Sequence, residues 1–180
     1  MIKRAVIIVD NGFEDTEFAY PFYRLQEAGF TVEVATKGKV DVKGKHGVAA
    51  NATVDADEIK EVDYDLAVVP GGRESPDRVR QIANVLQFLH DFDQKGKVIA
   101  STCHGPWVLV SAKVVAGRDV TAYPGCKDDL VNAGGNFKDE AVVVDRNLVT
   151  ATHYRDNAAW IKAALTQFET LSQAEATTAV

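Results

Sequence analysis

The organisation of this chain follows from the stretch Lys97-Val98-Ile99-Ala100-Ser101-Thr102-Cys103-His104-Gly105-Pro106-Trp107. Its apolar first half predicts a short buried strand, the Gly-Pro pair predicts a turn, and the apolar residues after Trp107 begin a helix. A cysteine between such a strand and such a helix has the pattern of a nucleophile elbow, in which a tight turn holds the side chain at the carboxyl edge of a sheet. The helix N-terminus favours negative charge, so we expect a stabilised Cys103 thiolate. The alternative is a buried structural cysteine.

Strand and helix patterns alternate along the rest of the chain. Apolar runs without alternation indicate parallel strands that are buried on both faces, at residues 5–9 and 66–70, and residues 30–35 are predicted to form a further strand. Helical spacing follows them at residues 14–28 and 79–92, and a hairpin at 141–151 precedes a last helix at 155–171. The order predicts an α/β fold, a three-layer sandwich with a mostly parallel central sheet. We expect a single domain over residues 1–171 and a frayed polar tail over residues 172–180.

Composition excludes several classes of function. The 20 basic and 26 acidic residues give a net charge of -6, which argues against a nucleic-acid partner. No apolar run approaches a membrane span, and the first residues enter a strand pattern without a secretory segment, so we expect a cytoplasmic protein with reduced cysteines. No G-x-G-x-x-G follows the first strand, and the histidines lack metal-ligand spacing. We therefore predict neither a cofactor nor a metal.

Several polar or flexible residues follow the predicted strands directly. Because ligands of such sheets bind beyond the carboxyl ends of the strands, we expect these residues to face one crevice. Glu14 is a candidate acid/base or hydrogen-bond partner of the thiol, or a helix-capping residue. Gly71 and Gly72 are candidate oxyanion donors, or a plain turn. His104 has the side chain best suited to proton transfer near neutral pH, and His153 follows the last strand.

At these residues the chain resembles the DJ-1/PfpI superfamily, and within it the PfpI-like branch of intracellular protease-like and deglycase-like proteins. The resemblance extends to about Leu171 and rests on several motifs in the same order. They are residues 12–17, 44–47, 69–73, 103–106, 117–118, 123–125, 128–134 and 142–145. It implies a flavodoxin-like fold, a nucleophile at Cys103 with His104 beside it, a glutamate at Glu14 that bonds the cysteine, and oxyanion donors at Gly71 and Gly72.

Two further positions follow from the resemblance alone. In the PfpI-like branch an acidic residue of the neighbouring subunit orients the histidine, and the matching position here is Asp77, one methylene shorter than the usual glutamate. The loop after the last strand departs from the family pattern at residues 151–156, and His153 within it is expected to line the substrate pocket. The resemblance also implies a homo-oligomer, a dimer or a hexamer, with the site near a subunit interface. Tyr20, Phe22 and Tyr23 are candidates for that interface or for the core.

The sequence thus predicts a cysteine-dependent enzyme, a hydrolase or lyase that acts on small reactive carbonyls or on their adducts with proteins and peptides, in stress protection. The resemblance implies a peptidase, glyoxalase or deglycase activity. One rival is a redox-sensing or chaperone-like stress protein without turnover, because an exposed thiol of low pKa oxidises readily. A second rival is a binding module with an inert cysteine.

Overall fold

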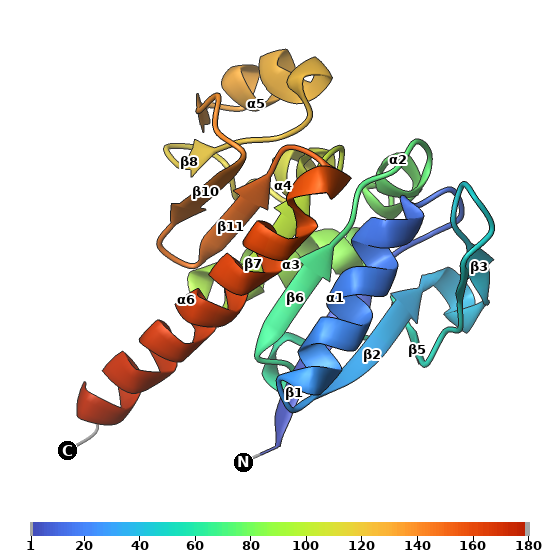
Figure 1. Cartoon of the computed structure of the whole chain (residues 1–180), viewed down its shortest axis with the longest axis horizontal. Coiled ribbons are helices and arrows are strands. Elements are labelled where there is room, and N and C mark those ends of the chain that lie inside the picture. The colour runs from blue at the N-terminus through green and yellow to red at the C-terminus, as the bar shows by residue number, and fades with distance from the viewer. Residues whose placement is uncertain (1, 179–180) are drawn as a thin grey trace.

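The computed structural model describes residues 2–178 and has a seven-stranded central sheet (Figure 1). The strand order is β10 (Val142–Asp145), β11 (Leu148–Ala151), β7 (Val98–Thr102), β6 (Leu66–Val69), β1 (Lys3–Ile8), β2 (Phe30–Thr36) and β5 (Val54–Asp55). All neighbours pair in parallel except β10 with β11, which form the expected antiparallel hairpin. The prediction of a mostly parallel central sheet is confirmed.

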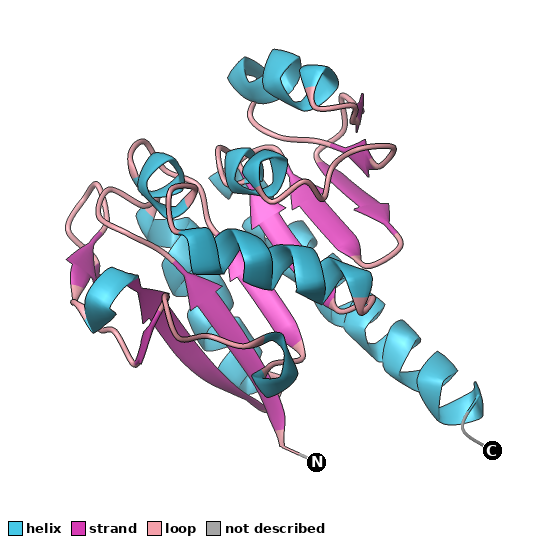
Figure 2. Cartoon of the chain, turned by 180° about the vertical axis from the view of Figure 1, so that it is seen from behind, coloured by secondary structure: helices cyan, strands magenta, loops and turns pink. Residues whose placement is uncertain are grey.

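Helices cover both faces of the sheet, which makes the expected three layers (Figures 1 and 2). The helices α1 (Asp15–Glu27) and α6 (Asn157–Thr178) pack on one face, and α2 (Ser75–Val79), α3 (Ala83–Gln94) and α4 (Pro106–Ser111) lie on the other. Strand β1 shows why: Ala5 and Ile7 belong to the apolar cluster beneath α1 and α6, whereas Val6 and Ile8 belong to the opposite cluster. A strand that is buried on both sides needs apolar residues at every position.

Smaller elements sit at the edges of this sandwich. A two-stranded hairpin, β3 (Val42–Lys43) and β4 (Ala49–Ala50), forms between β2 and β5. Strands β8 (Asp119–Val120) and β9 (Asn136–Phe137) pair around α5 (Lys127–Asn132). Short 3₁₀ turns occur at Lys37–Lys39, Glu61–Asp63, Pro124–Cys126 and Tyr154–Asp156. Within residues 2–178, no helix combines the length and apolarity that crossing a bilayer requires.

Two helix boundaries differ from the sequence-based expectation. The helix expected at residues 79–92 begins instead at Ala83, because Ile82 adopts an extended conformation, and Val79 ends the separate helix α2, which begins at Ser75 with Pro76 in its first turn. The helix expected to end at Leu171 continues to Thr178, so most of the expected frayed tail is helical. Its sequence explains the extension, since Gln173, Ala174 and Ala176 are good helix formers and neither Gly nor Pro interrupts them.

Candidate active site

The site lies where the order of the parallel strands reverses. Strand β1 has β2 on one side and β6 on the other, and β6 pairs in turn with β7. The segments that leave β1, β6 and β7 therefore open on the same edge of the sheet, which is where ligands bind in folds of this kind. They carry Glu14 and Glu17, Gly71 and Gly72, and Cys103 respectively.

Cys103 occupies a strained turn between β7 and α4. Its φ of 57° lies in the left-handed region, which is uncommon for a residue with a side chain. The Cys103 N–H donates to the Ala151 carbonyl at 3.0 Å, and its own carbonyl accepts from the Tyr123 N–H at 3.0 Å. A Cβ on Gly105 would approach the Val69 carbonyl oxygen to 2.4 Å, so this turn requires glycine at position 105. These contacts fix the side chain as the elbow pattern predicts, with Cys103 still 9% exposed.

Three donors or acceptors surround the Cys103 sulfur. The Nδ1 atom of His104 lies 3.2 Å from Sγ, so the two neighbouring side chains do open on one pocket. The backbone N–H groups of Gly72 and His104 also point at the sulfur. A Cβ on Gly71 would lie 2.7 Å from the Cys103 Cβ, and one on Gly72 would lie 2.5 Å from the Glu14 nitrogen. Gly71 is therefore required for the close approach of this loop to the nucleophile, and Gly72 for its close approach to the segment that precedes α1.

The carboxyl group that lies against the thiol belongs to Glu17, which the sequence reasoning missed. Glu17 is fully buried in the first turn of α1, and its Oε2 accepts the Gly71 N–H at 2.8 Å. Its Oε1 has no hydrogen-bond partner among the described residues. Burial raises the pKa of Glu17 to about 8, with the Glu14 charge adding to the effect and the Gly71 N–H opposing it. At neutral pH this carboxyl therefore holds a proton.

The hydrogen-bond role expected for Glu14 is corrected by this geometry. Glu14 precedes α1 and is 5% exposed, but its carboxylate forms an ion pair with Lys45 and its side chain caps no helix N–H. The reason is the first turn of α1. Glu17 comes three positions after Glu14, which is about one helical turn, and this turn places Glu17 next to the elbow. The expected oxyanion role of Gly71 is also corrected, because its N–H is already bonded to Glu17, whereas that of Gly72 faces the sulfur.

Electrostatics at the thiol differ from the expected stabilised thiolate. The pKa of Cys103 is raised to about 12, first by burial and then by the charge of an ionised Glu17, while the N–H groups of Gly72 and His104 oppose both effects. The helix beneath, α4, has six residues and does not outweigh desolvation. The pKa of His104 is lowered, first by burial and then by Lys45, so its imidazole is neutral near pH 7.

The other two predicted residues lie further from the sulfur. The ring of His153 is 6.3 Å from that of Tyr123, which itself stacks on His104 at 4.8 Å, so His153 lies at the rim of the site. Burial lowers the pKa of His153, and Arg155 adds to the effect. Asp77 is exposed on α2, and no hydrogen bond or ion pair joins it to His104 within residues 2–178. The structure thus brings Cys103, His104, Gly72 and Glu17 together and leaves Asp77 apart.

A buried cysteine on a strained strand–helix turn, with a neighbouring imidazole and a carboxyl group, defines a class of α/β proteins with a cysteine nucleophile elbow. The sequence profile of the DJ-1/PfpI family matches residues 3–167, and the chain belongs to this family. It is 41% identical over 159 residues to a deglycase of Pyrococcus abyssi, across 88% of this chain and 95% of the relative. It is 39% identical over 170 residues to protein/nucleic acid deglycase 2 of Escherichia coli, across 92% of this chain and 97% of the relative.

Solved structures show the same fold. The crystal structure of Drosophila melanogaster DJ-1beta superposes with a TM-score of 0.82 at 28% identity, covering 97% of each chain. The expected flavodoxin-like architecture is therefore confirmed. Within residues 2–178, no cluster of three side chains that could ligate a metal ion is present.

Proposed function

We propose that this protein is a cysteine-dependent deglycase or glyoxalase, which converts adducts of 2-oxoaldehydes into 2-hydroxy acids. The observation that supports the proposal most strongly is the contact of the Cys103 thiol with a neutral imidazole at 3.2 Å and with a buried carboxyl group that holds its proton. A nucleophile, a base and an acid therefore meet at one atom. The deglycase names of the similar proteins agree with such chemistry.

The reaction begins with transfer of the thiol proton to His104 Nδ1, as the sulfur bonds to the aldehyde-level carbon of the adduct. The bond from that carbon to the amine nitrogen breaks, and His104 returns its proton to the departing amine. The Glu17 carboxyl lies beside the sulfur, and in its protonated form it adds no negative charge there, whereas the carboxylate raises the pKa of the Cys103 thiol. The N–H groups of Gly72 and His104 lie beside the sulfur, where they stabilise developing charge during bond formation.

The adduct then needs no external oxidant or reductant. In the resulting hemithioacetal, a proton leaves the carbon bonded to sulfur and another is delivered to the adjacent carbonyl carbon, which gives a thioester of a 2-hydroxy acid. One carbon is oxidised and its neighbour is reduced by the same two electrons. Water cleaves the thioester and restores the Cys103 thiol. His104, which is neutral, is the group that accepts and returns protons in these steps.

A turnover assay tests this function. We expect wild-type protein to release N-acetylarginine and lactate from N-acetylarginine that was first modified with methylglyoxal, with many moles of product formed per mole of enzyme. Lactate is quantified enzymatically and the amino acid by mass spectrometry, with heat-inactivated protein as the control. Release of no more product than the control would contradict turnover and favour the redox-sensing or chaperone-like alternative, in which the thiol is oxidised and not regenerated by substrate.

We also propose that the protein forms a homo-oligomer in the cytoplasm. The exposure of Asp77 on α2 supports a role for it in a neighbouring copy, near that copy's His104. Cys103 and Cys126 are both free thiols, which suits a reducing compartment. Methylglyoxal-type carbonyls and their protein adducts are the substrates that we expect, with His153 at the rim of the pocket as a contact for them.

Complementation between inactive variants tests the role of Asp77. Asp77→Ala alone is expected to lower kcat/KM by roughly tenfold or more, as for loss of a group that orients a catalytic base. Mixing it with Cys103→Ser after dissociation and reassembly is expected to restore part of the activity, because a mixed interface pairs an intact Cys103 with an intact Asp77. The measurement is initial rate against mixing ratio. Activity that stays at the sum of the separate variants would contradict a shared site.

A further inference from the structure

The turn that joins β3 to β4, residues 44–48, is fastened to the start of α1. The buried Asp15 carboxylate accepts the His46 N–H at 2.9 Å through Oδ2 and the Val48 N–H at 2.7 Å through Oδ1. The Lys45 N–H donates to the Phe13 carbonyl at 2.9 Å. A Cβ on Gly44 would approach the Asp15 Cγ to 2.6 Å, so this contact needs glycine. The turn is therefore held in one place, although its side chains are exposed.

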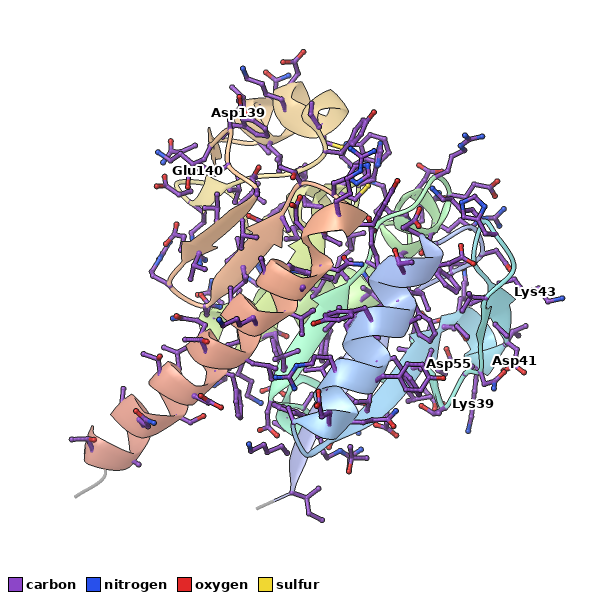
Figure 3. All side chains as sticks on the ribbon, viewed as in Figure 1. Lys39, Asp41, Lys43, Asp55, Asp139 and Glu140 are labelled. Carbon is purple, nitrogen blue, oxygen red and sulfur yellow. The ribbon has the colours of Figure 1, made fainter. Side chains whose placement is uncertain are left out.

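The result of this arrangement is a cation at the mouth of the active site. The Lys45 ammonium forms an ion pair with Glu14, whose side chain is 7% exposed, while the Lys45 side chain is 36% exposed. Lys43, on the same hairpin, has its side chain directed away from the body of the protein (Figure 3). The two lysines differ in what they face because Lys43 belongs to β3, whereas Lys45 lies in the turn that is bonded to the start of α1.

Charged groups from each segment around the pocket lie within electrostatic reach of Lys45. Glu14 precedes α1 and Glu17 lies within it, Cys103 and His104 form the elbow, and His153 follows β11. The positive charge of Lys45 lowers the pKa of Glu17, of His104 and of His153, and the negative charges of Glu14, Cys103 and Glu17 raise the pKa of Lys45. The charge of Arg155 also lowers the pKa of His153, whereas the charge of Asp156 raises it.

We propose that Lys45 is a positioning residue for the nucleophile: held over the pocket through Asp15, its ammonium balances the Glu14 carboxylate and supplies positive charge to the Cys103 thiolate. Without it, Glu14 would remain as an uncompensated, nearly buried carboxylate beside Glu17 and the sulfur. Negative charge on Cys103 would then become harder to form. The inference rests on the proposed function only in that the same sulfur is the nucleophile.

Alkylation of Cys103 by iodoacetamide, followed by mass spectrometry of the Cys103 peptide, measures this effect without turnover. At pH 7 we expect Lys45→Met to slow alkylation roughly tenfold, the equivalent of one pKa unit. Lys45→Arg keeps the charge and is expected to stay within about threefold of wild type. Lys43→Met is the matched control and is expected to react as wild type does. Glu14→Gln leaves the ammonium without its counter-charge and is expected to accelerate alkylation, which supplies a second test if Lys45→Met fails to fold.

Three outcomes would overturn the proposal. A Lys45→Met protein with the alkylation rate and pH profile of wild type would show that the charge has no effect on the sulfur. Equal losses in Lys45→Met and Lys45→Arg would indicate packing of the turn as the cause, and slower alkylation of Glu14→Gln would have the wrong sign. The readout is separate from the proposed function, since a wild-type protein that releases no 2-hydroxy acid fails the turnover assay and still reports the effect of Lys45 on alkylation.

Discussion

Cys103→Ser is expected to remove turnover of methylglyoxal adducts, with kcat/KM falling on the order of a thousandfold or more, as loss of a nucleophile does in other enzymes. A hydroxyl in this pocket would have to ionise against the same burial that raises the pKa of the thiol to about 12, and an alcohol is the far weaker acid. The other thiol, Cys126, is fully buried at the start of α5 and cannot substitute for it. The measurement is lactate release at pH 7 by purified variants of matched concentration.

Measuring the stability of the Cys103 variants distinguishes a loss of the nucleophile from a loss of the fold. Cys103 has a φ of 57°, and a residue without a Cβ adopts that conformation freely. Cys103→Gly is therefore expected to be inactive yet about 1 kcal/mol more stable than Cys103→Ala, as judged by urea denaturation. A Cys103→Ser protein that folds and keeps more than about one hundredth of wild-type activity would contradict the assignment of this sulfur as the nucleophile.

The elbow and the sheet could be predicted because their signals are local. Continuous apolar runs such as residues 66–69 indicate strands buried on both faces, and all four of these residues are fully buried in β6. The cysteine between β7 and the Gly105-Pro106 turn is likewise a feature of adjacent residues. Asp77 shows the limit of this reasoning, because its expected role rests on the family resemblance and the spacing of residues along the chain carries no signal for it.

Glu17 was missed although the sequence contains a signal for it. Positions 17, 21, 25 and 28 fall on one helical stripe, and the later three are Pro21, Leu25 and Ala28. A glutamate that continues an apolar stripe is a buried carboxyl group, and such groups are rare unless paired or functional. Glu14 was favoured because it follows the strand directly. The thiol pKa was mispredicted for a related reason, since the desolvation of Cys103 depends on tertiary packing that the chain order does not reveal.

Glu17 is the residue whose replacement should change the pH dependence of the reaction. Its pKa of about 8 means that the carboxyl is protonated at pH 7 and ionised at pH 9. In the protonated form its O–H is available to the sulfur, whereas the carboxylate repels negative charge there. Turnover starts from the protonated thiol and neutral His104, so its kcat/KM is expected to fall as the pH rises above 8, by about tenfold per unit once the carboxyl is mostly ionised. An ordinary thiol shows the opposite trend, because its thiolate fraction grows with pH.

A series of Glu17 variants tests this assignment through kcat/KM between pH 6 and 10. Glu17→Gln keeps an acceptor for the Gly71 N–H and an N–H donor for the sulfur, so we expect it to lose the alkaline decline and retain reactivity at pH 7 within about tenfold. Glu17→Leu removes both functions and leaves the Gly71 N–H without its acceptor. The kcat/KM of Glu17→Leu is expected to be lower than that of wild type by roughly a hundredfold or more.

Glu27→Gln provides the matched control for the series. Glu27 lies at the end of the same helix, where it is exposed and forms a surface ion pair with Arg24 at 3.2 Å. Exposed ion pairs contribute little to protein stability, so the pH profile of Glu27→Gln is expected to overlay that of wild type. If the alkaline decline persisted in Glu17→Gln, another group would have to titrate near pH 8. The proton that we place on Glu17 would then lie elsewhere, because the amide of glutamine does not ionise in this range.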